Sequence, residues 1–230
     1  MPQTLSQATK RAPWVVPVAA AIIAFLVYAL PPYLGLRPDM SRVPATTSWH
    51  YPALVAHIGF GLIAMITGFL QCWPWFRNRH LALHRKLGRV YVFGGVLPAA
   101  TAGLLVGITS PFGPVARFSH VVLVTLWFTS TVIGYRKARQ RDFRAHREWM
   151  IRSFALTFST ITNRIWSPLL VLLFEPQLDT TFGGSELAMF QAIGGLSSWL
   201  GWTVPLLVVE WVLLRKKRRA PRGAPVESAA

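Results

Sequence analysis

Six long apolar stretches dominate this chain of 230 residues and constrain its fold more than any other feature. A helix needs roughly 20 apolar residues to cross the hydrocarbon core of a bilayer. Because lipid cannot pair with backbone polar groups, stretches of this length predict helices. We therefore predict an all-α polytopic membrane helix bundle with six transmembrane helices. They are Trp14–Leu30, Pro52–Trp73, Leu87–Thr109, Phe118–Tyr135, Trp149–Phe174 and Leu187–Leu214.

The positive charges predict the orientation of these helices. With the amino terminus inside, the inner loops, tails and adjoining helix starts hold 20 of the 24 Lys and Arg residues. This asymmetry follows the positive-inside rule. We expect a cytoplasmic N-tail over 1–13, a membrane domain over 14–214 and a basic cytoplasmic C-tail over 215–230, in a bacterial inner membrane. The net charge of +16 then indicates contact with anionic lipids at the cytoplasmic face and not nucleic-acid binding.

Four histidines with similar spacing predict an internal duplication. His57 and His84 are 27 residues apart, and His120 and His146 are 26 apart. In each pair the first histidine opens an apolar run, and the second begins a His-Arg dipeptide after a basic loop. We interpret this as a two-helix unit used twice, over about 52–109 and 118–174. Helices 2–3 would then correspond to helices 4–5, with one histidine on each helix.

The rise of about 1.5 Å per residue predicts two polar layers inside the bundle. Such groups are expected to face the bundle or a polar cavity and not lipid. The outer layer contains His57, His120, Asn163 and Arg164. The inner layer contains His84, His146, Arg85, Arg89, Arg152 and Glu210.

Four residues are interpreted individually. Glu210 is expected to pair with Arg89 or Arg152, because an isolated carboxylate is costly at this depth. His50 and His80 are expected to be solvated residues at the interface. Cys72 is the only cysteine, which excludes an intramolecular disulfide and a covalent CxxCH haem site.

The paired histidines suggest a haem protein. A b-type haem needs two neutral imidazoles from facing helices at equal depth. His57 with His120, and His84 with His146, are the candidate iron ligands. Arginines could pair with the haem propionates, Arg164 in the outer layer and Arg85, Arg89 or Arg152 in the inner layer. Such a protein would carry electrons across the membrane, with a quinone or another redox partner, and its histidine spacing is similar to that of the two-haem transmembrane cytochromes b.

Two other hypotheses fit the same residues. An inner cluster of Arg85, Arg89, Arg147 and Arg152 could bind an anionic lipid, a quinone or a small anion without redox chemistry. A proton-coupled transporter could use His57, His120 and Arg164 as a polar path. No HExxH, CxxC, GxSxG or Walker motif occurs, so hydrolase and nucleotide chemistry has no support.

Three stretches of sequence carry a resemblance to a known family. They are HIGFGLIAMITGFLQ at His57–Gln71, HRKLGRVYVF at His84–Phe93 and HREWMIRSFALTFSTITNRIW at His146–Trp166. These stretches resemble the bacterial multi-pass family called domain of unknown function 2306. The resemblance implies a small helical membrane bundle, and it implies no established reaction, substrate or cofactor.

Overall fold

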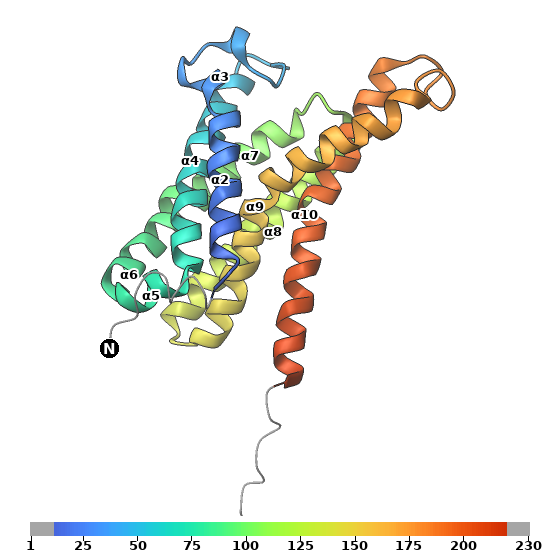
Figure 1. Cartoon of the computed structure of the whole chain (residues 1–230). Helices are drawn as coiled ribbons and strands as arrows, with labels where there is room; N and C mark the ends of the chain where they lie inside the picture. Colours follow the sequence, from blue (N-terminus) through green and yellow to red (C-terminus); the bar gives the residue numbers. More distant parts are fainter. Residues whose placement is uncertain (1–11, 220–230) are drawn as a thin grey trace, which may run out of the picture.

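The computed structural model describes residues 12–219, and this part of the chain contains helices and no strand. The expected tails therefore lie largely outside the described residues, from 1 to 11 and from 220 to 230. Successive long helices run in opposite directions (Figure 1). They are α2 (Val15–Ala29), α4 (His50–Cys72), α8 (Gly113–Arg139), α9 (Phe143–Phe174) and α10 (Glu186–Arg219). A further continuous rod consists of α6 (Leu81–Arg89), the π-helical segment η2 (Val90–Val96) and α7 (Leu97–Ile108).

Short helices fill the connections at both ends of the bundle. At the end where α2 finishes, the chain passes through α3 (Pro31–Leu34) and η1 (Pro38–Met40) before α4 begins (Figure 1). At the opposite end, α5 (Pro74–Arg79) joins α4 to α6. The η3 segment (Glu175–Gln177) follows α9. We call the end that carries α3 the outer end and the end that carries α5 the inner end, following the predicted orientation.

Each predicted apolar stretch is helical, and four of the described helices are long and apolar enough to cross a membrane. They are His50–Cys72, Leu81–Ile108, Gly113–Arg139 and Glu186–Arg215. The α2 helix is apolar but shorter. Polar residues within α9, including Asn163 and Arg164, reduce its hydropathy. The crossing of all six helices and the internal duplication therefore stay predictions.

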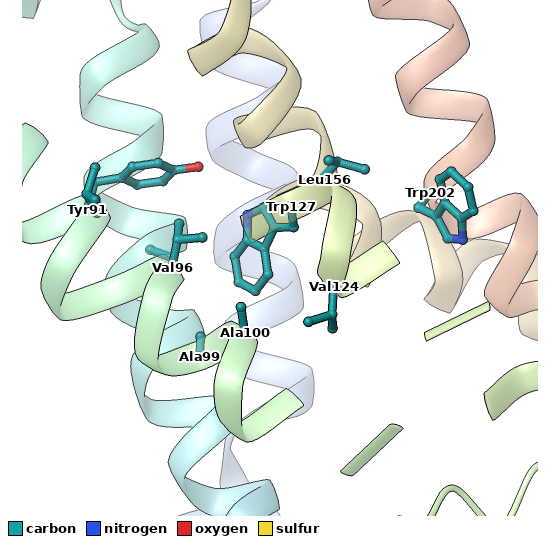
Figure 2. Packing of buried hydrophobic residues seen from close by; sticks show 10 residues of the cluster. Tyr91, Val96, Ala99, Ala100, Val124, Trp127, Leu156 and Trp202 are labelled. Carbon is teal, nitrogen blue, oxygen red and sulfur yellow. The ribbon is translucent and has the colours of Figure 1, made fainter. Parts of the chain in front are cut away.

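The central helices form a ring. The α7 helix packs between α4 and α8, α9 packs on α8 and on α4, and α10 covers α8 and α9. Helices α4 and α8 therefore lie on one diagonal of the ring, and the α6–α7 rod and α9 lie on the other. Facing side chains of the rod and α8 fill the core between them (Figure 2). Those that Figure 2 labels on these two elements are Tyr91, Val96, Ala99, Ala100, Val124 and Trp127.

The π-helical segment η2 contacts α4 closely. A Cβ at Gly95 would lie 3.0 Å from the backbone of Ala64, so the two backbones nearly touch. Small residues permit such contact between membrane helices. A single π-helical turn often occurs beside a functional site. Here it separates His84 at the inner end from the residues that contact His57 near the outer end.

Three expectations about individual residues can be compared with the structure. The pairing of Glu210 is confirmed, because Arg152 Nε and NH2 donate to its two carboxylate oxygens at 2.5 and 2.9 Å. The interpretation of His50 as a solvated residue is wrong, because its side chain is 0% exposed. The reason is local packing: His50 Nδ1 lies 2.9 Å from the Thr46 hydroxyl and 3.1 Å from the Thr109 hydroxyl. His80, in contrast, is exposed as expected.

Candidate functional site: two histidine pairs

The outer pair, His57 and His120, comes from diagonal helices that both press against α7. A Cβ at Gly103 would lie 2.7 Å from His57 Nδ1, and a Cβ at Gly107 would lie 2.8 Å from His120 Cβ. Gly103 and Gly107 are one helical turn apart on the same face of α7, about 6 Å along its axis. The two histidines therefore occupy adjacent positions on one helix surface.

A backbone carbonyl fixes the ring of His57. Nδ1 donates to the carbonyl oxygen of Ala99 at 2.8 Å. Because a neutral imidazole carries one N–H, a proton on Nδ1 leaves Nε2 as the acceptor. A histidine that binds metal commonly donates its other ring N–H to a carbonyl in this way. His120 differs, since its enclosed Nδ1 has no such bond to a neighbouring helix.

The inner pair, His84 and His146, shows the same difference between its two members. His146 Nδ1 donates to the carbonyl oxygen of Gly134 at 2.8 Å. His84 Nδ1 is enclosed and unpartnered. The two residues lie on the other diagonal, in α6 and α9, and each is within electrostatic range of the other. Each pair thus contains one imidazole held by a carbonyl of a neighbouring helix and one that is not.

The Nε2 atoms of these four histidines share an environment. None has a hydrogen-bond partner among the described residues, and none is fully enclosed by protein. The four histidine side chains are half-buried. No group of three or more His, Cys, Asp or Glu residues within the described part of the chain could hold a metal ion, and the histidines come in pairs.

A buried network of hydroxyl groups lies between the two pairs. The Tyr91 hydroxyl is 2.6 Å from Ser153 Oγ and 3.0 Å from Thr157 Oγ1. Trp127 Nε1 donates to Thr157 Oγ1 at 2.9 Å, and Thr131 Oγ1 lies 2.6 Å from Ser153 Oγ. Tyr91 is seven residues after His84, and Trp127 is seven residues after His120, so each lies two turns from its histidine on the same helix face.

This network could hardly be predicted from the sequence. The only signal was the i, i+4 spacing of Ser153 and Thr157, which is common in membrane helices. Such hydroxyls usually bond within their own helix, as Thr157 does with the Ser153 carbonyl at 3.0 Å. The contact with Tyr91 joins residues 62 and 66 positions apart, which no local pattern indicates.

Arg164 lies near the outer pair. It is within electrostatic range of both His57 and His120. Its NH1 donates to the Thr160 carbonyl and hydroxyl at 3.2 and 2.9 Å. The neighbouring residue Asn163 packs its backbone and Cβ against Gly201 of α10, on a different side of α9.

The predicted inner arginines differ in their partners. Glu210 neutralises Arg152, whose guanidinium also lies 4.9 Å from the centre of the Trp149 ring. Arg85 is exposed and acts electrostatically on His84. Arg89 is exposed and forms no ion pair with a described residue.

Two further arginines, Arg77 in α5 and Arg147 in α9, lie towards the inner end of the bundle. Burial, and after it the charge of Arg147, lowers the pKa of Arg77 in α5. Neither has a carboxylate partner among the described residues. Arg77 also acts on His84, so the inner pair lies in a strongly positive environment.

The fold and its histidine layers define an integral membrane protein built as a small helical bundle. The family described as predicted membrane protein, DUF2306, matches residues 54–213, and the chain belongs to this family. The matched range includes all four paired histidines, Arg164 and Glu210. No curated protein and no solved structure matches the chain.

Proposed function

We propose that this chain is a b-type haem protein of the bacterial inner membrane that carries electrons between the two membrane faces. The observation that carries the proposal is the common state of the four histidines. Their Nε2 atoms have no hydrogen-bond partner among the described residues and are not fully enclosed, two towards each end of the bundle. Haem b, when bound, supplies a one-electron carrier.

The donor set fits this cofactor. Two neutral imidazoles are sufficient to ligate a haem iron, and no third protein ligand is needed. His57 and His146 would be the oriented ligands, because the carbonyls of Ala99 and Gly134 hold their Nδ1–H groups. His120 and His84 would be the second ligands of the outer and inner sites. Arg164 outside, and Arg85 or Arg89 inside, would pair with propionates, whereas Arg152 is already occupied by Glu210.

Absorption spectroscopy tests the proposal. The chain would be expressed with a haem precursor, purified in mild detergent, and examined in oxidised and reduced forms. We expect a Soret band and a sharp reduced α-band, with haem content reduced by about half in His57→Ala and in His146→Ala. His80→Ala is the matched control, because His80 is exposed and outside both pairs. The absence of Soret absorbance in the wild-type protein would refute the proposal.

The unneutralised inner arginines favour a second candidate, which is binding of an anionic lipid, a quinone or a small anion without redox chemistry. Arg77 and Arg147 approach each other without a carboxylate partner among the described residues. This candidate predicts a co-purifying lipid or anion that is lost in Arg147→Gln, in protein without haem.

A further inference from the structure

We propose that Arg42 and Arg164 form an oxyanion-binding site at the outer end of the bundle, which takes a carboxylate or phosphate group. This site shares Arg164 with the proposed outer haem site, and it does not require that a haem is bound. Arg164 is on α9, and Arg42 is in the connection between η1 and α4. Figure 1 shows this connection above the outer ends of α2 and α4.

The position of Arg164 along its helix is the first step. Arg164 follows Trp149, where the predicted apolar stretch of α9 begins, by 15 residues, which corresponds to about 22 Å along the helix axis. The hydrocarbon core is about 30 Å thick, so Arg164 lies in the outer part of the membrane. A guanidinium at this depth needs an anionic or polar partner.

Aromatic side chains hold the two guanidinium groups in place. Arg164 lies 5.4 Å from the ring centre of Phe25 in α2, and Arg42 lies 4.0 Å from the ring centre of Tyr28 in the same helix. Phe25 and Tyr28 are three residues apart and therefore on one face of α2. The two arginines are within electrostatic range of each other, and the Tyr28 and Tyr33 hydroxyls are near Arg164. Two like charges thus converge beside two phenolic donors.

No protein carboxylate in the described part of the chain neutralises this pair. The described ion pairs include neither Arg42 nor Arg164. Asp39 is the only acid in the same connection, and Arg37 already binds it through NH2 at 2.7 Å and Nε at 3.3 Å. The Thr160 oxygens accept only from NH1 of Arg164, so other guanidinium N–H groups are free to donate.

The site is also accessible. Both arginine side chains are exposed, although protein atoms surround Arg164 on several sides. An exposed group of guanidinium and phenol donors suits planar carboxylate or tetrahedral phosphate oxygens, which arginine binds bidentately. The oxyanion has two sources on this side of the membrane, a dissolved anion or the phosphate of an outer-leaflet lipid.

Titration of haem-free protein with inorganic phosphate tests the site. The protein is expressed without haem precursor and held in a maltoside detergent, and binding is measured by phosphorus NMR line broadening. We expect binding by the wild type to weaken at least about tenfold in Arg42→Gln and in Arg164→Gln. Arg37→Gln is the matched control in the same connection and should bind like the wild type, because Asp39 already occupies Arg37. Arg42 is exposed, so its variant tests the site even if Arg164→Gln does not fold.

A second arm distinguishes the source of the oxyanion. Phosphate binding that persists in lipid nanodiscs identifies a dissolved anion as the ligand. Binding in detergent alone, with a phospholipid retained by the wild type and lost in Arg164→Gln by native mass spectrometry, identifies a lipid headgroup. Equal phosphate binding by wild type and both variants, or no binding and no retained phospholipid, would overturn the proposal. Since no haem is present, these outcomes are independent of the haem spectra.

Discussion

Arg152 of α9 and Glu210 of α10 form a bidentate ion pair within the bundle. Arg152 Nε and NH2 each donate to a separate carboxylate oxygen of Glu210, which fixes the rotation of the two helices relative to each other. The arginine side chain is 17% exposed and the glutamate side chain 36% exposed, so the pair is partly shielded from solvent. The pair links the inner halves of α9 and α10, which pack against each other extensively.

We predict that Glu210→Gln lowers the free energy of unfolding by about 1–2 kcal/mol, because Arg152 loses its neutralising charge while keeping one acceptor. A double-mutant cycle with Arg152→Met isolates the pairwise energy, for which we expect about 1 kcal/mol. Unfolding would be followed by helical circular dichroism in detergent. Additive effects of the two substitutions would show that the pair contributes nothing.

Much of the fold could be predicted from the lengths of the apolar stretches and the distribution of the positive charges. The helices begin and end close to the expected positions, because the thickness of the bilayer sets the length of an apolar stretch. The pairing of Glu210 was also predictable, since an unpaired carboxylate at that depth is costly. The need for a partner depends on Glu210 alone, although the partner itself, Arg152, is 58 positions away along the chain.

Features that depend on contacts between distant residues were not predicted. The burial of His50 depends on Thr109, which is 59 positions away along the chain. The hydrogen bond that fixes His57 depends on Ala99 and on the missing side chain of Gly103. The histidine spacing indicated which residues form pairs but not which member of each pair is held by a carbonyl.

Gly103 offers a test of the outer histidine site. A methyl group there would meet His57 Nδ1 at 2.7 Å and Cε1 at 2.8 Å, so Gly103→Ala must displace the imidazole. We expect a loss of stability of about 1–3 kcal/mol, typical of overpacking, and loss of outer haem if haem is bound. Gly61→Ala in α4 is the control, because a Cβ at Gly61 has no neighbour within 4 Å. Equal melting temperatures for both variants would contradict the close contact.

The hydroxyl network predicts a measurable effect for the loss of one oxygen. Tyr91→Phe removes the hydroxyl that lies between Ser153 and Thr157 and leaves these buried groups with fewer partners. We expect destabilisation by about 1 kcal/mol, measured by thermal unfolding in detergent. Tyr135→Phe serves as the comparison, because the Tyr135 hydroxyl has no hydrogen-bond partner among the described residues. The network contributes little if the two variants melt together.

The beginning of α9 has a pH dependence that can be measured directly. Asp142 accepts the backbone N–H of Ala145 at 3.1 Å, and this bond, followed by the Lys137 ammonium, lowers the pKa of the carboxyl. Because the pKa is lower in the folded state, the stabilisation is present above the unfolded value and is lost as the pH falls through the folded value. The protection factor of the Ala145 amide, which corrects the exchange rate for its intrinsic pH dependence, should therefore fall at acidic pH in the wild type. Asp142→Asn should lack this acidic transition, and an unchanged exchange profile in that variant would refute the assignment.

The six-helix topology predicts the location of reporter fusions. Gly183 follows α9 at the outer end, and α10 then returns to the inner end (Figure 1). With positive charges inside, a fusion at Gly183 should report the periplasm and one at the carboxyl terminus the cytoplasm. A cysteine placed at Ser41, beyond α2, should react with an impermeant thiol reagent added from outside. If the Ser41 site reacts only after the cells are opened while Gly183 reports the periplasm, the number of crossings between the two sites is odd, and the α4, α6–α7, α8 and α9 spans do not all cross the membrane.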